Sequence, residues 1–125
     1  MKSVQEFNLN LEQKTAVTNN NGPLLIIAGA GTCKTTVVTE KIKYLIAQGL
    51  AKPEEILALT FTEKASAEME ERVDIALPYG TFGLWISTFH AFCDRVLRSE
   101  ALHIGLPYDF KLMTEAETYL FVRKD

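Results

Sequence analysis

The fold of this chain is decided by residues 23–35, which read Pro-Leu-Leu-Ile-Ile-Ala-Gly-Ala-Gly-Thr-Cys-Lys-Thr. The apolar residues 24–27 show no polar alternation, which is typical of a strand buried in a parallel sheet. A loop with Gly29 and Gly31 follows, and Lys34 and Thr35 open a segment with helical periodicity. A strand, a glycine-rich loop, Lys-Thr and a helix in this order predict a phosphate-binding P-loop.

Such a loop favours a nucleoside triphosphate and Mg²⁺. Successive backbone N–H groups form a concave anion site, and the following helix adds the positive end of its dipole. Lys34 would reach the β- and γ-phosphates and the Thr35 hydroxyl would ligate Mg²⁺, which makes these two the candidate catalytic residues. The residues expected to contact the nucleotide at the loop are Ala28, Gly29, Ala30, Gly31, Thr32, Cys33, Lys34, Thr35 and Thr36. The simpler alternative is an ordinary turn between a strand and a helix.

Cys33 departs from the usual pattern G-x-x-x-x-G-K-[ST], in which it takes the place of the second glycine, while Ala28 takes the place of the first. A side chain at position 33 would cost about 1–2 kcal/mol if the backbone there needed a positive φ. A thiol beside Lys34 at a helix N-terminus would also be reactive. Three interpretations stay open: a tolerated natural variant, a weakened nucleotide site, and an introduced substitution.

Composition limits the classes of protein that fit. The chain has 125 residues of which 47% are hydrophobic, enough for one core. The net charge of −3 does not favour binding of nucleic acid by bulk electrostatics, so such a site must be a local patch. Cys33 and Cys93 follow no metal-binding spacing and predict free thiols in a reducing cytoplasm. No signal peptide and no apolar stretch of membrane-spanning length is apparent, so no membrane partner is expected.

Apolar periodicity and turn residues predict an alternation of strands and helices. Strands are expected at 24–27, 56–61 and 84–87, with a short one at 110–113; helices are expected at 10–18, 34–48, 62–76 and 89–101, and from Thr114 onward. This alternation predicts an α/β fold, in which a parallel sheet is flanked by helices. Ligands bind beyond the carboxyl ends of such strands, where the P-loop, residues 60–62 and residues 88–90 would meet.

Three further strings accompany the P-loop. They are Leu-Asn-Leu-Glu-Gln at 9–13, Ala-Leu-Thr-Phe-Thr-Glu-Lys-Ala-Ser-Ala-Glu-Met at 58–69, and Ile-Ser-Thr-Phe-His-Ala-Phe at 86–92. Their order and spacing resemble the Q motif, motif Ia and motif Ib of the UvrD/Rep/PcrA family of superfamily 1 DNA helicases. The resemblance covers about residues 8–125 and implies a truncated RecA-like P-loop NTPase fold. Residues 1–101 would be a partial RecA-like ATP-binding domain, and residues 102–125 would begin an inserted helical subdomain. Because the chain ends within a predicted helix, we expect an N-terminal piece of a longer protein.

The resemblance also assigns roles to single residues. Gln13 would hydrogen-bond the edge of adenine, although Asn10 and Gln13 also have the spacing of a helix capping box. Thr36 stands where many relatives carry an arginine near the nucleotide. The residues that resemble contacts with single-stranded DNA are Phe61, Thr62 and Lys64 of motif Ia, and Thr88, Phe89 and His90 of motif Ib. Aromatic rings can stack on bases, while hydroxyl groups, backbone N–H groups and His90 can bind phosphates.

Simpler roles compete with four of these DNA contacts. Phe61 fits a buried strand residue, Lys64 a solvated helix face, and Thr88 a plain helix N-cap. His90 fits a core or capping histidine.

The activity implied for the parent protein is that of an ATP-dependent DNA helicase, which translocates on single-stranded DNA and unwinds duplex, 3′ to 5′ by family analogy. Its partners would be single-stranded DNA and the remaining helicase domains. Relatives place catalytic carboxylates and a second motor domain farther along, so this chain alone should bind Mg-ATP and barely hydrolyse it. The alternatives are a nucleotide-binding module with a degraded P-loop and no motor activity, and a small-molecule kinase or other P-loop transferase.

Overall fold

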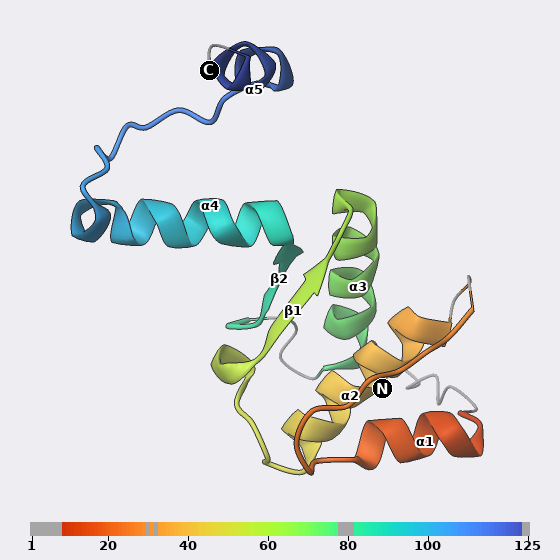
Figure 1. The fold of residues 1–125 in the computed structure, drawn as a ribbon. Helices are drawn as coiled ribbons and strands as arrows, with labels where there is room; N and C mark the ends of the chain where they lie inside the picture. The colour runs from red at the N-terminus through yellow and green to blue at the C-terminus, as the bar shows by residue number, and fades with distance from the viewer. Residues whose placement is uncertain (1–8, 30, 32, 78–81, 124–125) are drawn as a thin grey trace. The chain divides into compact units, whose positions relative to one another are not determined.

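The computed structural model describes residues 9–29, 31, 33–77 and 82–123. Two compact units divide the chain, Met1–Phe89 and His90–Asp125, and each is described by itself. The elements along the chain are α1 (Leu11–Thr18), α2 (Cys33–Ala47), the 3₁₀ turn η1 (Pro53–Glu55), β1 (Leu57–Thr60), α3 (Glu63–Ala76), β2 (Trp85–Thr88), α4 (Phe89–Glu100), the 3₁₀ turn η2 (Ala101–Ile104) and α5 (Glu115–Val122) (Figure 1).

The first unit is built around a parallel strand pair. β1 and β2 run in register from Leu57 opposite Trp85 to Thr60 opposite Thr88, and α3 forms the crossover between them. α3 packs against both strands, as Figure 1 shows. Because parallel strands end at the same edge, the residues that follow Thr60 and Thr88 lie side by side. The structure therefore confirms the α/β class and a parallel pairing of these two predicted strands.

The core of the first unit lies between α2, α3 and the strand pair. Its buried members are Ile42 of α2, Ala58 of β1, and Met69 and Val73 of α3, and Val73 has no exposed surface. Ser66, Met69 and Val73 recur at helical spacing along the buried side of α3. Partly buried apolar residues pack against this cluster: Ile46, Ile56, Leu77, Leu84 and Ile86.

The strand predicted at residues 24–27 is not formed. Leu25 and Ile27 are 83% and 90% exposed, and both described strands pair only with each other. An apolar run predicts burial, but a strand also needs a neighbour to complete its hydrogen-bond ladder. Residues 24–27 instead line an open pocket together with residues of α1. The described sheet thus has two strands, and a complete RecA-like sheet stays a prediction. The short strand predicted at 110–113 is likewise absent, since these residues form an irregular segment before α5.

Capping residues in the sequence correctly predict where α1, α3 and α5 begin. Asn10 and Gln13 form a reciprocal capping box at α1, and Thr114 and Glu117 form one at α5. The Thr62 hydroxyl accepts a hydrogen bond from the Ala65 backbone N–H at 3.1 Å and caps α3. Hydrogen bonds from the Thr114 backbone and hydroxyl lower the pKa of the Glu117 carboxyl. Since its folded pKa lies below its unfolded one, this contact stabilises α5 above the unfolded pKa and is lost as pH falls through the folded value.

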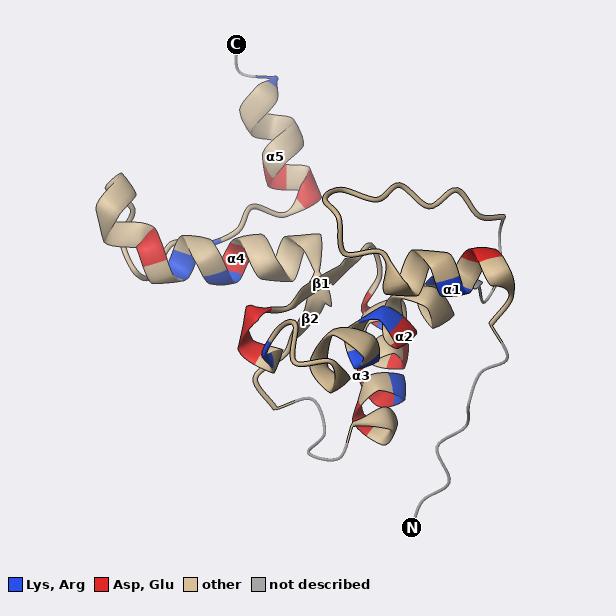
Figure 2. Ribbon diagram, turned by 90° about the horizontal axis from the view of Figure 1, so that it is seen from below, with Lys and Arg blue, Asp and Glu red and all other residues tan. Residues whose placement is uncertain are grey.

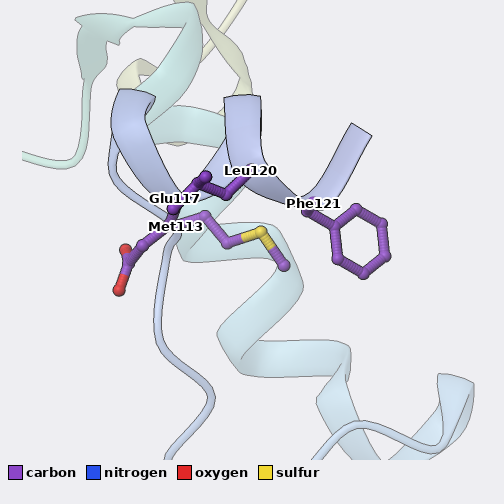
Figure 3. Close-up of a pocket in the computed structure, with 4 residues that line it drawn as sticks. All are labelled: Met113, Glu117, Leu120 and Phe121. Atoms are coloured by element: carbon purple, nitrogen blue, oxygen red, sulfur yellow. The ribbon is translucent and has the colours of Figure 1, made fainter. Parts of the chain in front are cut away.

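The second unit holds α4, η2 and α5. α4 carries both acidic and basic residues (Figure 2), and Arg98 pairs with Asp94 at 2.9 Å and also lies 4.8 Å from the centre of the Phe110 ring. Gly105 ends η2 with φ of 74°, a left-handed conformation that favours glycine. Met113, Leu120 and Phe121 line a pocket of about 320 Å³, and Figure 3 shows the Glu117 carboxylate pointing away from the Met113 thioether.

A buried hydroxyl on α2 gives a first testable prediction. Thr39 is 2% exposed, and its Oγ1 has no hydrogen-bond partner among the described residues. A buried hydroxyl without a partner costs about 1–3 kcal/mol, so Thr39→Val should raise the free energy of unfolding by about 1 kcal/mol. For a unit of this size the melting temperature should rise by about 4–8 °C in a thermal scan. Thr18→Val is the control. The exposed Thr18 hydroxyl already donates to the Lys14 carbonyl, so its removal should not raise the melting temperature. A lower melting temperature for Thr39→Val would contradict this reading.

Candidate functional site

A pocket of about 320 Å³ in the first unit gathers residues from α1, from the segment before the glycine-rich loop, and from α2. Its lining is Asn10, Glu12, Gln13, Ala16, Ile26, Ile27, Ala28, Lys34 and Val37. Three residues predicted to bind the nucleotide, Gln13, Ala28 and Lys34, therefore meet at one pocket although they come from three segments.

Among the described residues, the other predicted nucleotide contacts do not line this pocket. Thr35 is half-buried and Thr36 is buried, both in the first turn of α2. Gly29 and Gly31 belong to the loop itself. Ala30, Thr32 and the Cys33 side chain lie outside the described residues.

The loop backbone explains why residue 31 is a glycine, and it removes the backbone strain predicted for Cys33. Gly31 has φ of 138°, which L side chains rarely adopt, while nothing lies within 4 Å of where its Cβ would stand. Its requirement is therefore one of backbone torsion rather than space. α2 begins at Cys33, and no described residue other than glycine has a positive φ. A helical backbone accepts any L residue, so the strain predicted for a positive φ at position 33 does not arise.

Gln13 takes part in the capping box and in the pocket at once. Its Oε1 accepts a hydrogen bond from the Asn10 N–H at 2.9 Å, and its own N–H donates to Asn10 Oδ1 at 2.8 Å. The capping role proposed as an alternative is thus real, yet Gln13 still lines the pocket. With Oε1 engaged, the side-chain NH₂ group is the part that can donate to an acceptor such as adenine N7.

Lys34 and Thr35 supply the charge and the hydroxyl of the site. Lys34 is exposed in the first turn of α2, where its ammonium adds to the positive end of the helix dipole. Within the described part of the chain, no group of three or more His, Cys, Asp or Glu side chains could hold a metal ion. Mg²⁺ bound with nucleotides takes few protein ligands besides phosphate oxygens and water, so a single hydroxyl such as that of Thr35 fits it.

A second cluster lies where β1 and β2 end, and we call Phe61, Thr62, Lys64, Thr88 and Phe89 the strand-end surface. Phe61 is 89% exposed, so the interpretation of a buried strand residue is wrong. The Phe61 and Phe89 rings lie 5.2 Å apart between centroids, with an interplanar angle of 36°. Lys64 is exposed in the first turn of α3, whereas Thr88 is buried. The parallel register thus unites residues from two predicted motifs.

Sequence reasoning missed Glu63. The Thr88 hydroxyl donates a hydrogen bond to Glu63 Oε1 at 3.2 Å, which places a carboxylate among the predicted phosphate contacts. The signal was available, because Glu63 stands between Thr62 and Lys64 in the motif string. An anion at this place opposes the binding of another anion.

His90 starts the second unit. It is exposed in the first turn of α4, so the interpretation of a buried core histidine does not hold.

Residues 9–125 match the family described as the UvrD/REP helicase N-terminal domain. The chain belongs to this family. It is 47% identical over 109 residues to the ATP-dependent DNA helicase PcrA of Bacillus subtilis (strain 168), an alignment covering 87% of this chain and 15% of that protein. The PcrA helicases of Staphylococcus epidermidis (strain RP62A) and Staphylococcus aureus (strain Mu50) are each 45% identical, over 85% and 84% of this chain and 14% of theirs.

Membership of the UvrD/REP family confirms the resemblance drawn from the P-loop and its three companion strings. The chain spans about 15% of the length of the curated relatives it matches. The roles of single residues in the pocket and on the strand-end surface stay predictions. None of the described helices has the length and apolar character needed to cross a bilayer.

Proposed function

We propose that the chain is the ATP-binding part of an ATP-dependent DNA helicase, which translocates along single-stranded DNA and unwinds duplex in the 3′ to 5′ direction. The proposal that the chain binds ATP is supported by one observation: Gln13, Ala28 and Lys34 line the same pocket. The relatives named ATP-dependent DNA helicase support the assignment of the whole protein to this activity.

In this proposal the residues that line the pocket and those next to it have separate tasks. The Lys34 ammonium neutralises charge on the β- and γ-phosphates, and the loop made possible by Gly31 presents backbone N–H groups to them. The Thr35 hydroxyl would hold Mg²⁺, which would withdraw charge from the phosphate oxygens. Gln13 contacts the base from α1. Phosphoryl transfer depends on positioning and on charge stabilisation from several groups, so turnover would need the rest of the parent protein.

Calorimetric titration of Mg-ATP and Mg-ADP into this chain tests the proposal that it binds ATP. We expect saturable binding of one nucleotide per chain and no steady hydrolysis by the pure chain. Titrations without saturable heat would contradict the proposal. If Cys33→Gly also failed to bind, the second candidate function, a module with a degraded P-loop and no motor activity, would be favoured instead. If Cys33→Gly alone bound, the cysteine would have disabled a helicase nucleotide site.

We further propose the strand-end surface as the contact with single-stranded DNA. Exposed Phe61 beside Phe89 offers aromatic faces on which bases can stack without sequence preference. Thr62 and the first turn of α3 present backbone N–H groups, and Lys64 adds a positive charge, both suited to phosphates. Binding led by phosphates must weaken as the salt concentration rises.

Glu63 gives this surface a sharp test. Glu63→Gln removes the negative charge but keeps an oxygen that can accept from the Thr88 hydroxyl, so single-stranded DNA should bind about 3–10-fold more tightly at low salt. The gain should shrink as salt rises, because screening weakens charge repulsion. Fluorescence anisotropy with a labelled oligothymidylate measures the effect.

Glu68→Gln is the matched control, because it makes the same charge change at an exposed position farther along α3. An equal gain in both variants would mean that only net charge matters. No binding by either variant or by the unmodified chain would count against the strand-end surface itself.

A further inference from the structure

One lysine joins the two helices that carry the nucleotide pocket. Lys41 of α2 donates hydrogen bonds from Nζ to the Val17 carbonyl at 2.9 Å, to the Asn19 carbonyl, and to Asn20 Oδ1 at 2.9 Å. All three acceptors lie at the end of α1 or directly after it. An ammonium has three hydrogens, so these contacts use the whole donor capacity of Lys41.

The position of these acceptors explains why a lysine suits this place. The last carbonyls of a helix lack partners within the helix and carry the negative end of its dipole. A cation there satisfies carbonyl groups and interacts favourably with the dipole. Lys41 stands seven residues after Lys34 on α2, which is roughly 10 Å along the helix axis, and it is not among the residues lining the pocket.

The two helices need such a link because the chain between them is irregular. Gln13 lies on α1 and Lys34 on α2, and both line the same pocket. Among residues 19–32, those that the structure describes form no helix or strand. The spacing between Gln13 and Lys34 therefore depends on contacts between α1 and α2, which pack together with Val17 and Val37 buried.

We infer that Lys41 is a positioning residue, which fixes the base-contacting helix α1 against the phosphate-binding helix α2. The inference rests on the nucleotide site proposed above. It predicts that loss of Lys41 weakens the base end of the site and leaves the phosphate end intact, since Lys34 and Thr35 belong to α2, which also packs against α3.

The experiment compares two ligands that share the phosphate chemistry. Mg-ATP and Mg-tripolyphosphate are titrated into the unmodified chain and into Lys41→Met, with calorimetric detection. We expect Lys41→Met to weaken ATP binding about 10-fold and to change tripolyphosphate binding less than about 2-fold. Lys41→Arg, which keeps the charge and several donors, should restore most of the ATP affinity.

Lys43→Met is the matched control. It removes the same charge from the same helix, but Lys43 pairs with Glu40 at 2.8 Å instead of contacting α1. It should leave the ratio of the ATP and tripolyphosphate dissociation constants unchanged. Asn20→Ala removes only the Asn20 Oδ1 acceptor of Lys41 and should weaken ATP binding about 2–3-fold. This variant replaces Lys41→Met in the comparison if Lys41→Met fails to fold.

The outcomes separate this inference from the proposed function. Equal weakening of both ligands by Lys41→Met, or the same ratio change in Lys43→Met, would overturn the positioning role. If the unmodified chain bound ATP no better than tripolyphosphate, the base contact would be wrong, and the inference would fall with it. If the unmodified chain bound neither ligand, the nucleotide site itself would be wrong.

Discussion

Replacing Lys34 with alanine should abolish measurable binding of Mg-ATP, with a loss of affinity of about 100-fold or more. Truncating one partner of a charge pair that becomes buried on binding costs about 2–5 kcal/mol, and Lys34 lines the pocket together with Gln13 and Ala28. Because the Lys34 side chain is exposed, the free energy of unfolding should change by less than about 0.5 kcal/mol.

Calorimetry and a thermal scan on the same preparation separate these two quantities. Lys14→Ala is the control, because Lys14 is exposed on α1 and is absent from the pocket lining. Undiminished ATP binding by Lys34→Ala would mean that the phosphates bind elsewhere. Equal losses of ATP affinity in Lys34→Ala and Lys14→Ala would mean that only the net charge of the chain affects binding.

Replacing Met69 with alanine should lower the free energy of unfolding of the first unit by about 2–5 kcal/mol. Met69 is 5% exposed and packs with Ile42, Ala58 and Val73, so its truncation removes buried surface and leaves a cavity. Native domains are stable by only about 5–15 kcal/mol, so the loss would be a large share of the total.

Urea denaturation followed by circular dichroism measures this loss. Met113→Ala is the matched control, because Met113 is 55% exposed and should change stability by less than about 0.5 kcal/mol. Equal denaturation midpoints for the two variants would show that α3 is not held by this core.

The parts of the fold that depend on neighbouring residues were predictable from the sequence. The starts of α1, α3 and α5 follow from Asn10, Thr62 and Thr114, whose capping contacts reach three residues along the chain. The boundaries of β1 and β2 fell within two residues of the predicted ones. The strand predicted at residues 24–27 is wrong because a strand needs a partner from elsewhere in the chain, and an apolar pattern does not reveal whether that partner is present.

The candidate site divides in the same way. The motif strings identified Lys34 and the exposed Phe61, but neither Lys41 nor Glu63 was recognised. Both act through contacts with residues more than twenty positions away, Lys41 with the end of α1 and Glu63 with Thr88. Spacing along the chain carries no information on such pairs, and they became visible only when the helices and strands were placed.

The unpaired segment at residues 24–27 has a consequence for behaviour in solution. Within the described part of the chain these four consecutive apolar residues have no ladder partner, so they are a template on which a second molecule can form intermolecular β-structure. Ile26 and Ile27 belong both to this segment and to the lining of the nucleotide pocket. Self-association through the segment would therefore compete with ATP, and the apparent affinity should fall as the protein concentration rises.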